Sequence, residues 1–530
     1  MITAIILNIA VQVFKIILLI LCGAYVWFQW KFSHWIRKGV PGPMPYFPAG
    51  NITSVFSKKK QFFQPFIENY YKYKNNPFIG MFTLYNPVLL VNDLNLAKNI
   101  LVRDFNHFEA HGTIACEKID PLSVHIFNLH GDKWRRVRQN FSPIFTTGKI
   151  RGMVGHLLAV AKDFQCHIDQ AVVSNEPENL SLTFSKFTID MIGRMAFGVE
   201  CNSFKDPNSA FMKNAFEFFE PKIKKTLWFL APELFRKLGT ESRRPETIEF
   251  FLNLVQETVA YREANNIERN DFLQMLIHLK KNVLTDENGT YAFLLVNLRD
   301  NLEHLFAGMS WSQMAAHSMV FLAAGYESTS STAAFAVYEL AQNCDVLQRT
   351  RDEIFAVLEK HNGDITYETL ADMDYLTLVI EETLRKHPPM RALFRRCTKN
   401  YIIPGTKTLI EEGTWAFVPI QAFQNDPEIF PEPEKFIPER FLPKNKTANQ
   451  IAAYMPFGDG PKMCLGVRFG MMAAKIALVS FLTRYEFSLS AQTPIPMQYS
   501  TKPFSLAAEP GVFAHITLLN NNSMPSTDKA

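Results

Sequence analysis

The stretch MPFGDGPKMCLGVRFG, residues 455–470, holds one cysteine, Cys464, among four glycines. Gly458 and Gly460 permit tight backbone turns and the close approach of a flat cofactor. A helix predicted to begin near Gly466 offers free backbone N–H groups and a positive dipole end, and both stabilise a thiolate. The stretch therefore favours Cys464 as a thiolate ligand. The alternative is a buried thiol before an ordinary helix, which is the commoner situation for an isolated cysteine.

The composition indicates a folded globular protein. The chain has 530 residues, of which 47% are hydrophobic and 20% charged, and its formal net charge is +4. A charge this close to balance gives no reason to expect a nucleic-acid partner. The seven cysteines are odd in number, widely spaced and without a Cys-x-x-Cys pair. This pattern argues against a disulfide framework and a structural zinc site, and favours a reducing compartment.

The N-terminus predicts an uncleaved transmembrane anchor over residues 1–30. The chain is apolar from Ile2 to Trp30 and is long enough to span a bilayer as a helix. A cleaved signal peptide is the alternative, but the apolar part is too long for one. Lys15 keeps an interfacial helix open as a second alternative. The positive flank, comprising Lys31, Arg37 and Lys38, indicates that the following chain lies in the cytoplasm.

The rest of the chain reads as one large domain, mainly α with a smaller β region. A basic, proline-rich hinge covers 31–50, because Pro41, Pro43, Pro45 and Pro48 disfavour helix. One domain is predicted over 51–519, and a disordered polar tail over 520–530. Apolar periodicity predicts helices over 134–141, 180–197, 245–264, 312–342, 346–361, 375–386 and 466–484. Two β-like runs, 81–92 and 401–410, lie beside turn signals.

The stretch FLAAGYESTSSTAAFA, residues 321–336, puts Gly325, Glu327 and several hydroxyls inside an apolar helix. Glycine and hydroxyl side chains there favour a local kink or a widened groove. Glu327 in such surroundings requires a partner or a function. The alternative is a helix of small residues that packs closely in the core.

Two further motifs supply charged groups. In EETLRKHPP, residues 381–389, Glu382 and Arg385 are spaced for an ion pair, and the later stretch FIPERF offers Arg440. In GDKWRRVRQNF, residues 131–141, Trp134 and Arg138 lie one turn apart and can donate to carboxylates. Each motif is common by chance, and a solvated basic helix explains the second equally well.

The order and separation of these motifs resemble the cytochrome P450 family, from the anchor to the last β-like segment near residue 517. The resemblance is to the animal microsomal type, which includes insect detoxification and vertebrate hepatic drug-metabolising members. The stretches FSPIFTTGKI (141–150) and GVRFGMMAAKIAL (466–478) are similar to insect members. The resemblance implies the cytochrome P450 fold, with a single large catalytic domain behind the N-terminal anchor.

The resemblance implies that Cys464 is the axial thiolate of a haem b iron. Phe457 and Gly458 would lie beside the sulfur, and Gly325 would face the cofactor. The haem propionates would pair with Trp134, Arg138, Arg395 and Lys462. The family usually has arginine at the position of Lys462, and lysine lacks the planar fork, so we expect a weaker grip on haem.

The resemblance also implies a proton relay from Glu327 to Ser328, with Thr329 as a second possible hydroxyl. The usual alcohol is threonine, and serine has a less restricted rotamer. We therefore expect turnover with more leakage to hydrogen peroxide. Glu382, Arg385 and Arg440 would form a structural ion-pair triad.

The implied reaction is insertion of one oxygen atom from O₂ into a lipophilic small molecule, in xenobiotic or endogenous lipid or hormone metabolism. No part of the chain resembles a flavin or NADPH module, so electrons from NADPH would come through a separate NADPH–cytochrome P450 reductase, with cytochrome b5 as a second candidate donor. The implied location is the endoplasmic reticulum membrane, with a single-pass anchor and a cytoplasmic catalytic domain. Arg135, Arg136 and Lys462 would contribute to a basic docking face, although a solvated cluster explains them equally well. Pocket walls would come from 108–129, 211–235, 388–394 and 500–507, the second of which suits a flap at the membrane.

Three alternatives remain. A haem-thiolate isomerase needs no proton relay, and a non-catalytic carrier of haem or lipophiles gives Glu327 no function. A membrane-anchored adaptor without haem leaves the cysteine loop unexplained.

Overall fold

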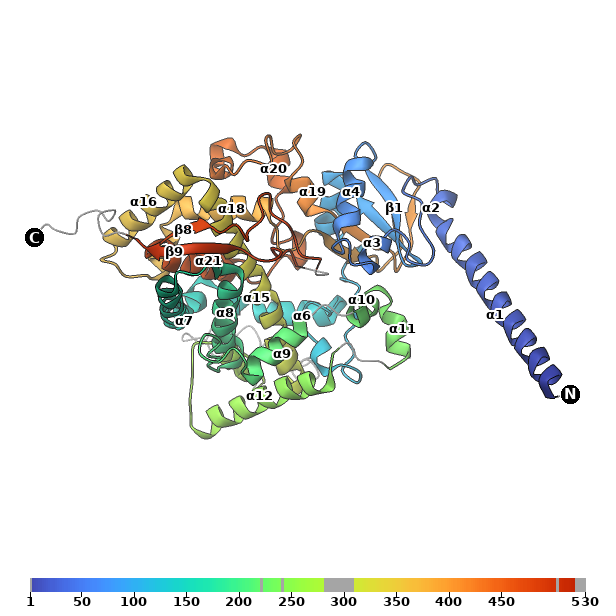
Figure 1. Cartoon of the computed structure of the whole chain (residues 1–530), viewed down its shortest axis with the longest axis horizontal. Coiled ribbons are helices and arrows are strands. Elements are labelled where there is room, and N and C mark those ends of the chain that lie inside the picture. Colours follow the sequence, from blue (N-terminus) through green and yellow to red (C-terminus); the bar gives the residue numbers. More distant parts are fainter. Residues whose placement is uncertain (1, 220–222, 240–242, 281–308, 502–504, 520–530) are drawn as a thin grey trace, which may run out of the picture. The chain divides into compact units, whose positions relative to one another are not determined.

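The computed structural model describes residues 2–219, 223–239, 243–280, 309–501 and 505–519 (Figure 1). The chain packs into two compact units, Met1–Gly112 with Ala392–Ala422, and Thr113–Arg391 with Phe423–Ala530. The prediction of one catalytic domain over 51–519 stays a prediction, and the predicted tail 520–530 lies outside the described residues.

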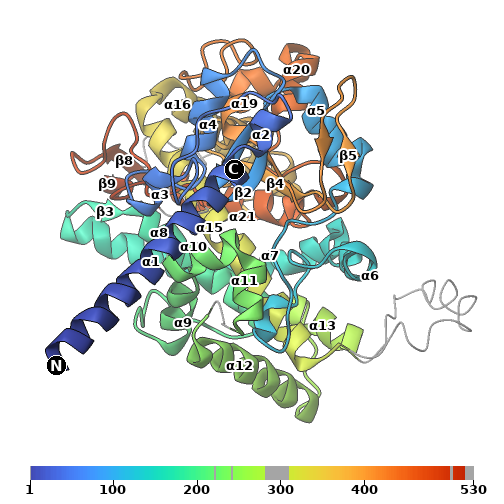
Figure 2. The same ribbon diagram turned by 90° about the vertical axis from the view of Figure 1, so that its right-hand side faces the viewer.

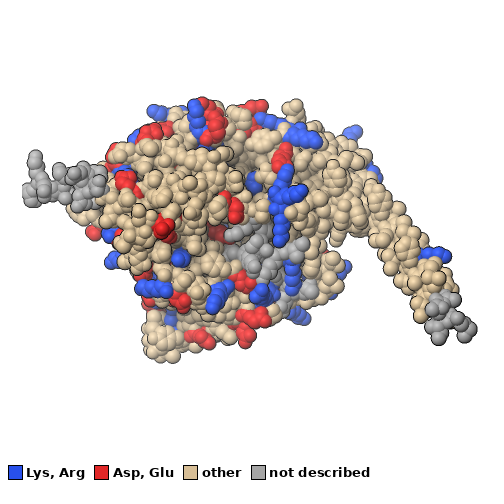
Figure 3. All heavy atoms as spheres, in the orientation of Figure 1, with Lys and Arg blue, Asp and Glu red and all other residues tan. Residues whose placement is uncertain are grey.

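The first unit begins with helix α1, Ile2–Phe32. Within the described residues it is the one helix long and apolar enough to cross a membrane, by length and composition. Figure 3 shows it almost without charged side chains. Its C-terminal end packs on the rest of this unit, with Phe28 against Phe47 at 4.9 Å and Phe32 against Phe82 at 5.3 Å between ring centroids. After the short helix α2, His34–Arg37, the proline-rich stretch 38–50 contains no helix.

A four-stranded sheet forms the centre of the first unit, in the order β1-β2-β7-β4. Its strands are β1 (Phe78–Thr83), β2 (Asn86–Val91), β7 (Trp415–Val418) and β4 (Leu393–Arg396). The predicted run 81–92 is a β1–β2 hairpin, and 401–410 contains β5 (Tyr401–Ile402) paired with β6 (Leu409–Ile410). Gly80 allows close packing, because a Cβ there would lie 2.1 Å from the Trp35 ring. The short helices of this unit are α3 (Thr53–Phe56), α4 (Gln64–Lys72) and α5 (Leu94–Lys98).

The second unit is mainly helical and contains all seven predicted helices. They are α6 (Gly131–Phe141), α8 (Leu180–Ile192), α12 (Pro245–Ala264), α15 (Trp311–Gln342), α16 (Cys344–Lys360), α18 (Asp374–Lys386) and α21 (Val467–Leu482). The helix predicted over 180–197 ends earlier as an α-helix, since Gly193–Phe197 forms a π-helical turn. Other helices are α7 (Thr147–Ser174), α9 (Ala210–Phe219), α10 (Ile223–Leu230), α11 (Pro232–Lys237), α13 (Phe272–Lys280), α17 (Tyr367–Ala371) and α20 (Ala448–Ala453).

Helix α15 runs through the middle of the second unit, beside α8, α12 and α21 (Figures 1 and 2). A capping box between Ser310 and Gln313 begins it, and small or apolar side chains let it pack on several neighbours. The helix runs without a break from Trp311 to Gln342, and the expected kink or widened groove stays a prediction. Its hydroxyls donate to carbonyls one turn back, as Ser331 does to Glu327 O at 2.6 Å.

A three-stranded sheet in the order β3-β9-β8 completes the second unit, with β3 (Glu178–Asn179), β9 (Phe513–Leu518) and β8 (Tyr485–Leu489). Just before β9 the chain folds back on itself, with Tyr499 bridged to Ala508. Ser505 is bridged to Met390 directly after α18, which brings this segment to the side of α15.

Candidate active site

The cysteine loop adopts the tight backbone that its glycines predict. Gly458 and Gly460 have φ of +78° and +73°, a left-handed conformation that other residues adopt at a cost. Cys464 N–H donates to Phe457 O at 2.8 Å, which closes the loop. Helix α21 then begins with Gly466 as its N-cap. The loop therefore presents a single thiol at the start of a helix, where the dipole is positive.

The thiol of Cys464 retains exposed surface although protein atoms surround it. Burial raises its pKa, while a hydrogen bond from the Gly466 N–H and the positive charge of Arg138 lower it, and the net effect is an increase. A thiol with a raised pKa is protonated at neutral pH, so a metal ion is needed to hold it as a thiolate.

Arg138, on α6, is a half-buried cation near this thiol. Burial lowers the pKa of its guanidinium, and the Cys464 charge opposes that effect. The guanidinium makes no hydrogen bond or ion pair with any residue that the structure describes. Since a desolvated charge is stable only with a counter-ion, this arrangement fits an anionic group from outside the chain.

Trp134 also lies on α6, and the side chain of Lys462 packs on its ring. Trp134 is buried, and Lys462 Nζ lies 4.8 Å from the centre of its ring and donates to Leu129 O at 2.9 Å. Lys462 is itself buried, so it is not part of an exposed docking face and that expectation is wrong for this residue. Arg135 pairs with Asp132 at 2.8 Å.

This donor set fits haem. The thiol is a suitable axial ligand, the glycine turns leave room for a flat ring, and Arg138 offers a charge for a carboxylate. Arg395 lies on β4 in the first unit, buried and donating to Phe394 O at 2.9 Å, and its expected contact with haem stays a prediction.

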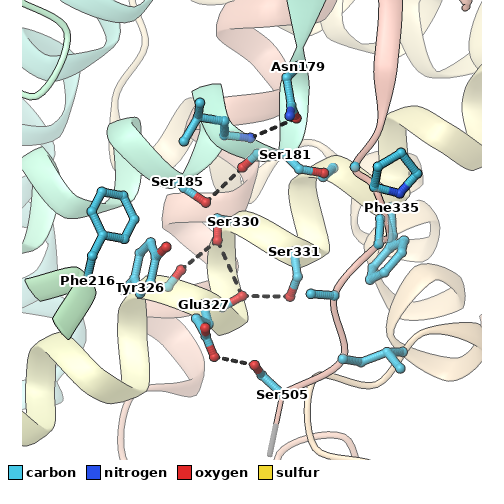
Figure 4. A pocket seen from close by; sticks show the side chains of 17 residues that line it. Asn179, Ser181, Ser185, Phe216, Tyr326, Glu327, Ser330, Ser331, Phe335 and Ser505 are labelled. Atoms are coloured by element: carbon cyan, nitrogen blue, oxygen red, sulfur yellow. Dashed lines mark hydrogen bonds between the residues drawn. The ribbon is translucent and has the colours of Figure 1, made fainter. Parts of the chain in front are cut away.

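The site residues predicted on α15 have different surroundings in the structure. Ser328 Oγ donates to Ala324 O at 2.5 Å, and Thr329 is buried. The Glu327 carboxylate accepts a hydrogen bond from the Ser505 hydroxyl (Figure 4). A Cβ on Gly325 would lie 2.5 Å from Ile192 of α8, so close helix packing is a sufficient reason for glycine there. Its expected contact with haem stays a prediction.

The structure brings the predicted triad together. Glu382 and Arg385 are fully buried and form a bidentate pair at 2.7 and 2.9 Å, and Arg440 Nε lies 3.4 Å from Glu382 Oε1. Arg385 also donates to the carbonyls of Gln424 and Pro433 at 2.9 and 2.7 Å. The cluster therefore ties α18 to the chain segment over 424–440.

Sequence reasoning missed two polar links to α15. One is the Ser505–Glu327 bond, although 500–507 was expected to be a pocket wall. The other is a buried chain in which His387 Nε2 lies 2.6 Å from Glu339 Oε1 and His387 Nδ1 lies 2.9 Å from the Tyr499 hydroxyl. No local pattern signals either link, because the partners are far apart in the sequence.

Comparison with known proteins identifies the family of the chain. The profile of the family "Cytochrome P450" matches residues 40–514. The probable cytochrome P450 6a14 of Drosophila melanogaster is 38% identical over 92% of this chain and 95% of its own length. Cytochrome P450 6a8 of the same species is 37% identical, again over 92% and 95%. Cytochrome P450 6k1 of Blattella germanica is 35% identical over 93% and 94%.

The fold and the site define a mainly helical oxidoreductase that uses a haem group with a thiolate ligand. The chain belongs to the cytochrome P450 family and is of the animal microsomal type. It is a monooxygenase, and both its family and its apolar α1 indicate a membrane-anchored protein.

Proposed function

We propose that this P450 oxidises a lipophilic xenobiotic, or an endogenous lipid or hormone, with NADPH-derived electrons. A separate NADPH–cytochrome P450 reductase supplies the electrons, and cytochrome b5 is a second candidate donor. The protein works at the endoplasmic reticulum membrane with its catalytic part in the cytoplasm. The observation that carries the proposal is the solvent-accessible Cys464 near the guanidinium of Arg138, which pairs with no residue that the structure describes.

Haem, when bound, supplies the oxygen chemistry, and a thiolate ligand favours cleavage of the O–O bond. The chain's own residues do the rest. Cys464 Sγ would bind the metal, and the Gly466 N–H would stabilise the charge on that sulfur. Arg138, Trp134, Lys462 and Arg395 would hold the carboxylates of the cofactor.

Glu327 and Ser328 deliver protons. The Glu327 carboxylate takes up a proton from solvent, and the Ser328 hydroxyl passes a proton to the reaction centre and regains one from Glu327. The Ser328 hydroxyl, which donates to Ala324 O within the helix, would turn from that carbonyl to pass its proton.

The flap around α10 and α11 supports a lipophilic substrate. Leu234 and Leu238 are exposed there, at 49% and 63%, beside the basic pair Arg236 and Lys237. Exposed apolar side chains flanked by basic ones suit contact with a lipid surface. Residues 220–222 of the expected flap lie outside the described residues.

The test is a carbon monoxide difference spectrum of the reduced full-length protein in detergent, beside the Cys464→Ser variant. A strongly red-shifted Soret band in the wild type that is lost in the variant supports thiolate-bound haem. A band in the range of histidine-ligated haem in both proteins would refute the role of Cys464. Product formation that depends on added reductase then separates oxygenation from isomerisation.

A further inference from the structure

A cavity of about 200 Å³, lined by polar and apolar residues in similar measure, lies against α15 in the second unit (Figure 4). It is bounded by α8, α15 and the chain over 505–511. Five serines and one carboxylate supply much of its polar surface: Ser181, Ser185, Ser330, Ser331, Ser505 and Glu327. A cavity of this size holds several water molecules at about 30 Å³ each, and each needs two or more polar partners.

The serine hydroxyls are oriented to accept hydrogen bonds from the cavity. Ser185 donates to Ser181 O at 2.7 Å, Ser330 to Tyr326 O at 2.9 Å and Ser331 to Glu327 O at 2.6 Å. A hydroxyl has one proton, so these oxygens keep only their lone pairs for a ligand. Together with the carboxylate they form a surface of acceptors, which suits a small donor such as water.

The cavity extends from the molecular surface to Glu327. Two of its lining residues, Leu182 and Pro510, are exposed, which places one end at solvent. Glu327 precedes Ser328 in α15, and successive helix residues differ by about 100° in direction. The acid therefore stands between the cavity and the hydroxyl that the proposed relay uses.

Ser505 holds the acid at this position. Its hydroxyl donates to Glu327 Oε2, and its backbone is fixed by the bridge to Met390 and by the bond from Leu506 N to Pro389 O at 2.9 Å. A hydroxyl on a fixed backbone selects one carboxylate rotamer, which a solvated glutamate would not keep. A rotamer held in this way keeps one carboxylate oxygen at the cavity.

We propose that this cavity is the water-filled proton inlet of the enzyme and that Ser505 is the positioning residue for Glu327. The inference rests on the proposed monooxygenase function. In each cycle, a proton crosses from bulk solvent through the cavity water to the Glu327 carboxylate. The same carboxylate releases one proton to Ser328, so the charge of the relay is restored.

The test uses the full-length protein with a microsomal reductase, NADPH and 7-ethoxycoumarin as the probe. We compare Ser505→Ala, which removes the hydroxyl, with Ser505→Thr, which keeps it. The control is Ser174→Ala, which removes an exposed serine hydroxyl at the end of α7, outside the cavity lining. The readouts are the rate of NADPH oxidation, the peroxide formed per NADPH and the solvent isotope effect in D₂O.

We expect S505A to slow product formation about tenfold, the lower value for one hydrogen bond to a charged group, with more peroxide per NADPH and a larger isotope effect. S505T and S174A should behave as the wild type. Equal changes in S505A and S505T, or none in S505A, would overturn the inference. The carbon monoxide spectrum keeps the two proposals distinct, because a wild-type protein without the thiolate band refutes the proposed function itself.

Discussion

At the scale of single residues, the site contains a thiol and a guanidinium whose charges the described residues do not neutralise. The Cys464 thiol has a raised pKa, so the chain alone does not stabilise its anion. Arg138 is desolvated without a carboxylate among the described residues. A cofactor that brings both a metal and carboxylates satisfies the two groups at once, which links haem binding to local order.

Replacement of Arg138 by Leu should weaken haem retention about tenfold to a hundredfold, because a hydrogen bond to a charged group contributes about 1.5–3 kcal/mol. Transfer of haem to apomyoglobin measures this. Arg136→Leu, an exposed residue of the same helix, is the control. If both variants retained haem like the wild type, Arg138 would have no part in binding.

Replacement of Ser328 by Thr should lower the peroxide formed per NADPH. The added methyl restricts χ1, so the hydroxyl spends more time in a single orientation. Simultaneous assays of peroxide and NADPH give the ratio. An unchanged ratio would show that the serine does not cause leakage.

At the scale of elements, the buried triad joins α18 to the segment that leads to the cysteine loop. Arg385→Ala removes the bidentate partner of the buried Glu382, which keeps Arg440 and the Ile437 N–H, and should cost about 3–5 kcal/mol, a large share of a typical total of about 5–15 kcal/mol. Arg236→Ala is the matched control, since Arg236 and Glu233 have the same i,i+3 spacing at an exposed site. That pair should contribute at most about 1 kcal/mol. Urea unfolding followed by circular dichroism compares the two, and equal losses would argue against the triad's structural role.

His317 on helix α15 is buried, and it makes the free energy of unfolding depend on pH. His317 is 1% exposed, packs on the Phe141 ring at 4.5 Å, and burial lowers its pKa to about 3. In the unfolded chain the pKa is about 6.5, so below this pH the unfolded state binds more protons and the free energy of unfolding falls. At pH 5.5 this histidine alone should cost about 1.4 kcal/mol relative to neutral pH.

Urea unfolding of His317→Leu at pH 7.5 and 5.5 checks this effect. The variant should lose less stability on acidification than the wild type, by about 1.4 kcal/mol. His515→Leu, at an exposed site on β9, is the control. An equal loss in His317→Leu and the wild type would mean that His317 is not held neutral.

At the scale of the whole molecule, α1 is apolar and exposed over most of its length, whereas its last turn is part of the first unit. A deletion of residues 2–30 keeps Phe32 and Trp35, which pack on Phe82 and Gly80. We expect the shortened protein to leave membranes in an alkaline carbonate wash, and the full-length protein to stay. A shortened protein that stays with the membranes would show that other surfaces suffice for anchoring.

The helices were predictable because their apolar residues repeat with the helical period over long stretches, as in 245–264. The π-helical turn at 193–197 was not predictable, because one extra residue in a single turn hardly changes the spacing of the apolar residues. The hydroxyls of α15 suggested a kink, and the kink stays a prediction; Ser331 and Thr332 donate to carbonyls of their own helix.

The sequence by itself determined the thiol, the apolar α1 and the Glu382–Arg385 pair, because each depends on residues close together in the chain. It also determined the family, because the order and separation of the motifs can be read along the chain without knowing how they pack. The tertiary structure alone decided that Lys462 is buried and that Ser505 reaches Glu327 across 178 residues of sequence. Contacts of this kind follow from how helices and loops pack, and local spacing carries no record of that packing.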